Sequence, residues 1–183
     1  MEHAIEVEEE MFDPAISLEV RIWKYTASTG KRLVASLGCG HDGDVHSTRT
    51  KTAVKFFRTP EDFHRELSVY QRLRECAVDE VLGHALPQLL SWDEELLALE
   101  MSIVRKPYLL DFASAYLDWP PDFSPEALEE WSQRKAKEFG RHWPKVQLIL
   151  AFLGDQYGVY LTDIHRGNIA FDSGDTEEFS SSS

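Results

Sequence analysis

The sequence predicts an α+β fold, with a mostly antiparallel sheet in its first half and helices in its second half. Short apolar segments separated by turn residues fill residues 16–101, and one strong helix signal interrupts them. Beyond them, two segments combine a helix start signal with helical or nearly continuous apolar spacing. A chain of 183 residues has room for one such domain, made of two small lobes.

Composition restricts the partners that this chain can have. Its 32 acidic and 19 basic residues give a net charge of -13, and no basic tract or basic helix is present, which argues against nucleic acid or an anionic membrane as partner. Cys39 and Cys76 are too few for a structural zinc site or a disulfide framework. The acidic N-terminus has no apolar signal core, and no run approaches membrane length, so we expect a cytoplasmic protein.

The structure of the first segments is predicted from their charge and from the alternation of apolar and polar residues. Residues 1–14 are predicted to be a loose acidic lead-in that Pro14 ends. Apolar and polar side chains alternate over residues 16–22, which predicts a first strand. Thr29-Gly30-Lys31 predicts a hairpin turn into a second strand at 32–37. Further strands are predicted at residues 45–47, 52–57, 88–92 and 96–101.

A G-x-G-x-x-G string lies between the second and third of these strands, at Gly38, Gly40 and Gly43. The string alone is weak, because glycine is common in turns and the same string opens dinucleotide-binding folds. A dinucleotide site needs a helix next and an acidic ribose ligand about 20 residues on. Here Val45 and another strand follow, so the flanks favour a phosphate cradle on a hairpin, with Lys55 as its lysine. The alternative is a flexible hairpin loop.

One helix is strongly predicted in the first half, at residues 60–75. Thr59-Pro60-Glu61-Asp62 combines a threonine cap, a proline at the first helical position and two acids near the positive end of the helix dipole. An apolar stripe at helical spacing should face the core: Phe63, Leu67, Tyr70 and Leu73. Glu66 lies inside or beside this stripe, and a buried carboxylate needs a partner. Lys55 is the nearest rational one, and the alternative is that both side chains are solvated.

The second half is predicted to be helical. After a hinge at residues 102–110, Ser124-Pro125-Glu126 repeats the cap, proline and acid signature and opens a helix through Phe139. Trp143-Pro144 begins a helix that is apolar nearly all round, so we expect it to be buried and to support the polar loop after it. The tail at 172–183 has four acids, no base and four final serines, so disorder is expected there.

That polar loop contains Asp163 and Asn168, with apolar residues on both sides. Their separation is that of the catalytic aspartate and the metal-binding asparagine in the kinase loop D-x-x-x-x-N. An Asx-rich turn that caps the preceding helix is the alternative. We expect His165 to order the loop by hydrogen bonding, whereas Arg166 either meets a substrate anion or is solvated.

In their order along the chain, these motifs resemble the protein-kinase-like superfamily. The D-x-H-x-G-N string at 163–168 is more similar to aminoglycoside and choline kinase-like enzymes than to the H-R-D loop of protein kinases. Residues 100–104 and 115–121 also resemble segments of short, uncharacterised bacterial kinase-like proteins. The resemblance implies a minimal protein-kinase-like fold with an acidic lead-in at 1–14, an N-lobe at 15–101, a hinge and truncated helical C-lobe at 102–171, and a tail at 172–183.

The resemblance also implies ATP and Mg²⁺ as cofactors. Backbone amides of Gly38, Gly40 and Gly43 would lie over the phosphates beside Val45. Lys55 would neutralise phosphate oxygens, and Glu66 would hold its ammonium. Leu99 would be the gatekeeper, with the backbone of Glu100 and Ser102 facing the adenine edge and their side chains of little consequence.

Asp163 would accept the proton of an attacking hydroxyl, and Asn168 would bind magnesium. Kinases need a second metal ligand, the D-F-G aspartate, about a dozen residues further on, and no D-F-G occurs here. Asp172 is the preferred substitute, Asp175 is another, and a partner chain that completes the site is a third solution. The predicted function is an ATP-binding phosphotransferase acting on a hydroxyl acceptor. The alternative is a pseudokinase that binds nucleotide or a protein partner as a regulatory module.

Overall fold

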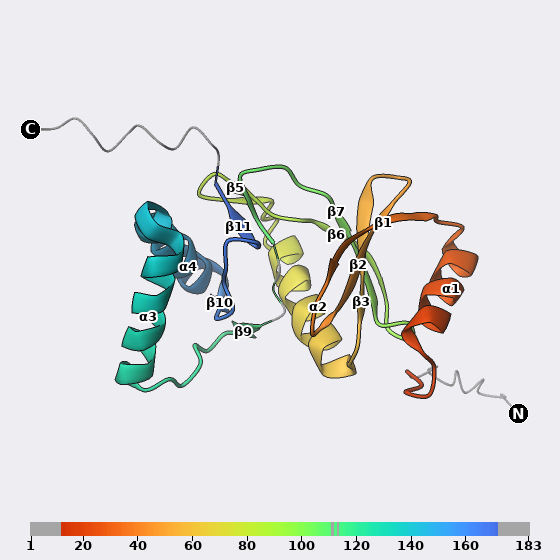
Figure 1. The fold of residues 1–183 in the computed structure, drawn as a ribbon, viewed down its shortest axis with the longest axis horizontal. Helices are drawn as coiled ribbons and strands as arrows, with labels where there is room; N and C mark the ends of the chain where they lie inside the picture. Colours follow the sequence, from red (N-terminus) through yellow and green to blue (C-terminus); the bar gives the residue numbers. More distant parts are fainter. Residues whose placement is uncertain (1–11, 111, 113, 172–183) are drawn as a thin grey trace, which may run out of the picture. The chain divides into compact units, whose positions relative to one another are not determined.

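The computed structural model describes residues 12–110, 112 and 114–171 of the chain. They form two compact units, which Figure 1 traces along the sequence. The sheet unit comprises the described residues through Phe63 together with Leu90–Glu100, and the helical unit comprises His64–Leu89 and the described residues from Met101 on. No helix in the described part of the chain is long and apolar enough to cross a membrane.

A five-stranded sheet is the main element of the sheet unit, with the strand order β1-β2-β3-β7-β6. The strands are β1 (Leu33–Cys39), β2 (Gly43–Thr48), β3 (Thr52–Phe57), β6 (Leu89–Asp93) and β7 (Ala98–Ser102). Strand β2 pairs antiparallel with both β1 and β3. The α+β prediction with an antiparallel sheet is confirmed, and each of these strands lies within two residues of its predicted bounds.

The predicted strand at 16–22 is wrong, because the chain forms helix α1 (Leu18–Thr29) there. Ser17 caps its N-terminus, where the side-chain oxygen accepts a hydrogen bond from the amide of Val20 at 3.4 Å. Gly30 ends the helix in the left-handed conformation, with φ 68°. The predicted hairpin turn at Thr29–Lys31 is therefore a helix C-cap.

One face of α1 packs on the sheet, beside which it lies in Figure 1. Tyr25 meets Phe56 edge to face, with ring centroids 5.4 Å apart. The cluster around this pair consists of Val54, Leu96 and Ala98 with the partly buried Leu18, Ile22 and Leu33. Leu18, Ile22 and Tyr25 follow the i, i+4, i+7 spacing of a helix face. The apolar pattern over residues 16–22 thus fits a strand and a helix equally well. The capping residues Ser17 and Gly30 favour the helix.

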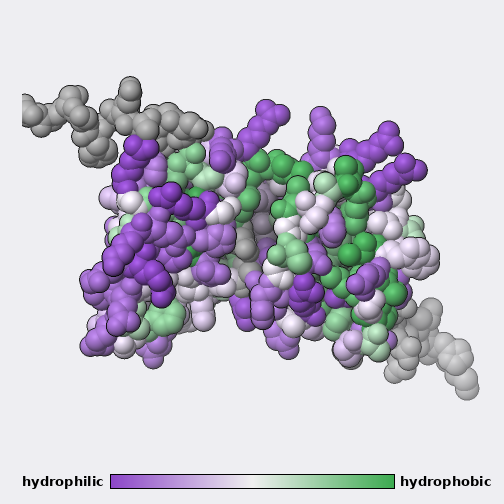
Figure 2. Space-filling model, in the orientation of Figure 1, coloured by the Kyte–Doolittle hydropathy of each residue, from purple (hydrophilic) through white to green (hydrophobic). Residues whose placement is uncertain are grey.

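The predicted helices at 60–75, from Ser124 and from Trp143 are confirmed as α2 (Pro60–Glu75), α3 (Pro125–Phe139) and α4 (Trp143–Tyr157). The apolar stripe of α2 is buried, since none of Phe63, Leu67, Tyr70 and Leu73 is more than 4% exposed. Figure 2 shows a largely hydrophilic surface over α3. The expectation that α4 is buried nearly all round is wrong in part, because Val146, Ile149 and Leu153 are buried but Leu148 is 60% exposed.

Short strands bracket the polar loop in the helical unit. A four-stranded sheet has the order β11-β8-β5-β4, with the strands β4 (Glu80–Val81), β5 (His84–Ala85), β8 (Tyr108–Leu109) and β11 (Ile169–Ala170). A separate pair joins β9 (Ala115–Leu117) and β10 (Val159–Leu161). The loop therefore leaves one paired strand, β10, and returns to another, β11. The prediction of a polar loop between buried segments is confirmed for β11, whereas Tyr160 and Leu161 of β10 are half-buried.

Candidate functional site

The glycine run forms a β-hairpin, as predicted. Gly38 lies in β1 and Gly43 in β2, and the amide of Gly40 donates to the carbonyl of Gly43 at 2.9 Å across the turn. A Cβ on Gly43 would lie 2.2 Å from the carbonyl oxygen of Phe56, so no side chain fits there. A Cβ on Gly38 would meet nothing within 4 Å, and one on Gly40 only the Gly43 carbonyl oxygen at 3.9 Å. Gly43 is thus required by sheet packing, whereas the other two glycines leave space open.

Three of the predicted nucleotide-binding residues lie in one row across the sheet. Val45 of β2 is paired with Gly38 of β1 on one side and with Lys55 of β3 on the other. Directly paired residues of antiparallel strands place their side chains on the same face. Lys55 is only 7% exposed, and its ammonium lies 4.9 Å from the ring centroid of Phe57. The alternative prediction, that Lys55 is solvated, is therefore wrong.

This row lies on the face of the sheet that is turned away from α1. Side chains alternate between the two faces along a strand. Val54 and Phe56 of β3 pack in the cluster under α1, so the intervening Lys55 points to the opposite face. Glu66 of α2 is 1% exposed, which also excludes a solvated glutamate. Its pairing with Lys55 stays a prediction.

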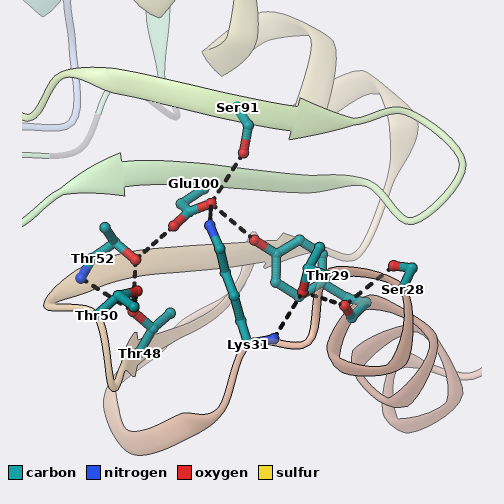
Figure 3. A network of polar contacts seen from close by, with 9 residues as sticks. Ser28, Thr29, Lys31, Thr48, Thr50, Thr52, Ser91 and Glu100 are labelled. Carbon is teal, nitrogen blue, oxygen red and sulfur yellow. Dashed lines mark hydrogen bonds and ion pairs between the residues drawn. The ribbon is translucent and has the colours of Figure 1, made fainter.

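The side chain of Glu100 forms a hydrogen-bond network that the sequence did not predict. The side chain is 2% exposed and accepts hydrogen bonds from the hydroxyls of Thr52 at 2.6 Å, Ser91 at 3.1 Å and Tyr25 at 3.2 Å. The ammonium of Lys31 forms an ion pair with the same carboxylate. Figure 3 shows Lys31, Thr52 and Ser91 converging on Glu100 from separate segments of the sheet unit. We call this set the Glu100 network.

The network determines the charge of Glu100. Burial acts to raise the pKa of its carboxyl group, but hydrogen bonds from Lys31, Thr52 and Ser91 outweigh burial and hold that pKa below its usual range. Tyr25 belongs to α1 and Thr52 to β3, so the carboxylate joins the helix to the sheet. The expectation that the Glu100 side chain is of little consequence is wrong for the fold.

Ser102, the other predicted adenine contact, is engaged at the end of β7. Its amide donates to the carbonyl of Gln88 at 2.9 Å, and its hydroxyl accepts from the amide of Gln88 at 2.9 Å. The amide of Ser102 is thus already paired within the helical unit. Leu99, the predicted gatekeeper, is fully buried.

Hydrogen bonds within the Asp163–Asn168 loop fix its shape. Asn168 is 3% exposed, and its side-chain oxygen accepts from the amide of His165 at 2.8 Å, while its side-chain nitrogen donates to the carbonyl of Asp163 at 3.0 Å. The ring nitrogen Nδ1 of His165 accepts from the amide of Gly167 at 3.0 Å, which confirms the ordering role predicted for this histidine. A Cβ on Gly167 would lie 2.7 Å from that ring, so a larger residue at this position would displace the His165 side chain.

Helix α3 holds the loop from outside, a role that the sequence assigned to α4. Trp131 donates its indole N–H to the carbonyl of Thr162 at 3.1 Å, and the ammonium of Lys135 bonds the carbonyl of Ile164. Glu138 accepts from Lys135 at 2.9 Å and from the amide of Arg166 at 3.2 Å.

We call Trp131, Lys135 and Glu138 the α3 clamp. Their i, i+4, i+7 spacing places them on one face of the helix. The sequence signal for this contact was Lys135, a lysine on the same helix face as Trp131. Lys135 is 8% exposed.

The carboxylate of Asp163 is exposed and forms no hydrogen bond with any residue in the described part of the chain. Asp172 and Asp175, the substitute metal ligands, lie outside the described residues. Within the described ranges, no group of three or more His, Cys, Asp or Glu side chains is arranged to hold a metal ion. The predicted ligand set of Asn168 and Asp172 therefore stays a prediction.

Comparisons with known proteins give partial likenesses of fold. No protein-family model matches the chain, and a search of curated proteins finds no match. Three solved aminoglycoside phosphotransferase structures, each 17% identical, are similar to part of it. The streptomycin–ATP–APH(2")-IIa ternary complex covers 53% of this chain and 32% of its own, with a TM-score of 0.38. The ADP-bound APH(2'')-Ib covers 46% and 28%, with a TM-score of 0.37, and the gentamicin–APH(2")-IIa complex 49% and 29%, with 0.39.

The likeness to each of these structures extends over about half of this chain. It spans less than a third of each neighbour's own length, at 32%, 28% and 29%.

Proposed function

We propose that this chain is an ATP-binding, kinase-like protein whose nucleotide lies against the Gly38–Val45–Lys55 row. The row is the observation that supports the proposal, because it combines a glycine with open space, an apolar side chain and a buried ammonium on one face. A glycine without Cβ allows close approach to phosphates, and a buried ammonium neutralises their oxygens. Val45 offers an apolar contact to the nucleoside.

Glu66 has the role of holding the Lys55 ammonium in this proposal. Both side chains are buried, at 1% and 7% exposure, and buried charges require compensation. A carboxylate on α2 that pairs with the lysine would keep the ammonium charged and fix its direction toward the phosphates. Adenine is proposed to contact the backbone of Glu100 and the carbonyl of Ser102, since the Ser102 amide is paired with Gln88.

The proposed reaction moves the γ-phosphoryl group of ATP to a hydroxyl acceptor. The acceptor oxygen forms a bond to the γ-phosphorus while the bond to the bridging oxygen of ADP breaks. Asp163 accepts the hydroxyl proton, and its exposed carboxylate is presented by a loop whose backbone Asn168 fixes. Mg²⁺, when bound, would supply further neutralisation of phosphate charge, with Asn168 and Asp172 as the proposed ligands. One lone pair of the Asn168 side-chain oxygen remains for that purpose.

A catalytically inactive regulatory module is the second candidate. It is favoured by Asn168, whose side-chain amide oxygen and nitrogen are both used in hydrogen bonds inside the loop. Such a module would bind nucleotide or a protein partner, and a partner chain could also complete the site.

A nucleotide-binding and turnover experiment on the full chain separates these outcomes. Thermal unfolding is followed with ATP, with and without Mg²⁺, for wild type, Lys55→Met and Asp163→Asn, and ADP release is measured in parallel. Lys51→Met, an exposed lysine in the turn before β3, is the matched control. We expect stabilisation by ATP to be lost in Lys55→Met but kept in Lys51→Met, and ADP release to be lost in Asp163→Asn. Stabilisation of wild type without ADP release would select the regulatory module, and no effect of nucleotide on wild type would reject both candidates.

A further inference from the structure

Strand β1 is one edge of the five-stranded sheet, and its outer side is exposed. The sheet has the order β1-β2-β3-β7-β6, and β2 is the one strand in the described part of the chain that pairs with β1. Every residue of β1 from Val34 to Cys39 is exposed. The outer N–H and C=O groups of an edge strand can pair with a strand of another molecule.

The composition of β1 does not prevent such pairing. Native sheets protect their edges with charged side chains, prolines, bulges or a covering segment. The seven residues of β1, Leu33 to Cys39, include no charged residue and no proline. Two register shifts against β2 bend the strand, but they leave the apolar Val34 and Leu37 66% and 55% exposed. An apolar, uncharged edge is thus available to a partner.

The two ends of β1 carry opposite charges. At its start, the exposed Arg32 lies beside the exposed Arg49, whose amide donates to the Arg32 carbonyl at 2.9 Å. Neither arginine forms an ion pair with another residue in the described ranges. Beyond the other end of β1, the turn to β2 holds Asp42, whose side chain is 35% exposed. Asp44 is already paired with Arg58 at 3.0 Å, so Asp42 is the acid that a partner would meet.

We propose that the outer side of β1 pairs with β1 of a second copy of this chain. A two-fold axis perpendicular to the sheet makes the two strands antiparallel, so the basic start of one strand lies beside the acidic end of the other. Arg32 and Asp42 each lie five positions from Leu37 in the sequence. An axis at Leu37 therefore brings Arg32 of each copy near Asp42 of the other, and the two Leu37 side chains meet at the centre.

Charge and symmetry favour a second copy over an unrelated peptide. A second copy supplies an uncharged strand together with both complementary charges, and the two-fold axis forms each charge pair twice. An acidic peptide would match the basic end alone. Pairing across a two-fold axis also uses the β1 edge of both copies, so it closes and does not propagate through this edge. Because Gly38 belongs to β1, the Gly38–Val45–Lys55 rows of the two copies would lie in one continuous sheet.

Sedimentation equilibrium of the full chain tests the proposal. We expect wild type to dimerise with a Kd on the order of micromolar, as for a small interface. Leu37→Lys places two charges at the axis and should raise this Kd at least about tenfold. Leu90→Lys, which changes an exposed leucine of the other edge strand β6, is the matched control and should change it less than about twofold. A wild type that is still monomeric at about 100 µM, or equal effects of the two variants, would overturn the proposal.

Charge reversal tests the direction of the two strands. Arg32→Glu should raise the Kd about tenfold over the two symmetric pairs, because acids then face each other. Combining Arg32→Glu with Asp42→Arg restores opposite charges and should return the Kd to within about threefold of wild type. A tighter dimer of Arg32→Glu, or a double variant that is no tighter than Arg32→Glu alone, would exclude the antiparallel arrangement.

Disulfide trapping tests the position of the axis. Cys39→Ser and Cys76→Ser first remove the two exposed cysteines. In that background, Leu37→Cys should give a disulfide-linked dimer under mild oxidation, because opposed residues of antiparallel strands have Cα atoms about 5 Å apart. Leu90→Cys in the same background should stay unlinked. Equal cross-linking at the two positions, or none with Leu37→Cys, would overturn the proposed pairing.

Discussion

The Glu100 network and the Asp163–Asn168 loop satisfy buried polar groups in opposite ways. In the network, four side chains surround a single carboxylate: Tyr25, Lys31, Thr52 and Ser91. In the loop, side chains bond the backbone, with the α3 clamp on the outside and Asn168 on the inside. The network therefore centres on one buried charge, whereas the loop is held by many separate bonds to its own carbonyls and amides.

This difference separates structural acids from an available one. The carboxylate of Glu100 is buried and accepts from four side chains, although it lies in the strand that the kinase resemblance assigns to adenine. Asp163 has its carbonyl bonded by Asn168 but its carboxylate exposed. The carboxylate of Asp163 is therefore open to a ligand, as the proposed function requires.

The largest effect should come from removing the charge of Glu100. We expect Glu100→Gln to lower the free energy of unfolding by about 3 kcal/mol, because Lys31 then lacks its counter-charge and an amide cannot accept all the donors. Urea unfolding at neutral pH measures this change. Glu95→Gln, whose carboxylate pairs with Lys24 at 3.1 Å on the surface, is the control and should cost less than about 1 kcal/mol. Equal costs for the two variants would show that the network adds nothing beyond a surface pair.

Protonation of Glu100 at low pH should destabilise the protein in the same way as Glu100→Gln. The folded-state pKa of Glu100 lies below its unfolded value of about 4.3, so the folded protein favours the deprotonated form. Its contribution to stability is then complete above the unfolded pKa and is lost as the pH falls through the folded pKa. We expect the difference in unfolding free energy between wild type and Glu100→Gln to shrink as the pH falls from about 5 to about 3. A difference that is constant over this range would contradict the assignment.

A smaller loss is expected from breaking the α3 clamp. Lys135→Met keeps the length of the side chain but removes the donor to the carbonyl of Ile164, which leaves a buried acceptor without its bond. We expect a loss of about 2 kcal/mol in urea unfolding. Lys137→Met, an exposed position on the same helix, should change stability by less than about 0.5 kcal/mol. Should Lys135→Met be as stable as Lys137→Met, the clamp would be incidental.

The elements of the fold also differ in how well the sequence predicted them. Helices α2 and α3 begin where Thr59-Pro60 and Ser124-Pro125 predicted, because caps and prolines act within a few residues. The strand predicted at 16–22 failed because the local pattern fits two periods. The two-residue strand β11 has no local signal, since it pairs with β8, a distant segment of the chain.

The candidate site follows the same rule. The row of Gly38, Val45 and Lys55 could be predicted because the hairpin that aligns it is local. The α3 clamp could not, because the contacts of Trp131 and Lys135 join residues about thirty positions apart. The partners of Glu100 were missed for the same reason, since Tyr25 and Lys31 lie some seventy positions away.

The smallest effect on stability, and the sharpest separation of structure from function, should come from Asp163. Asp163→Asn keeps the backbone carbonyl that Asn168 bonds and changes only an exposed carboxylate, so we expect a change below about 0.5 kcal/mol in urea unfolding. Asn168→Leu, in contrast, removes both bonds inside the loop and should cost about 2 kcal/mol. If Asp163→Asn instead destabilised the protein as much as Asn168→Leu, the carboxylate would belong to the fold. An Asp163→Asn protein that is as stable as wild type but no longer releases ADP would place this residue in the reaction, because nothing else in the loop depends on its charge.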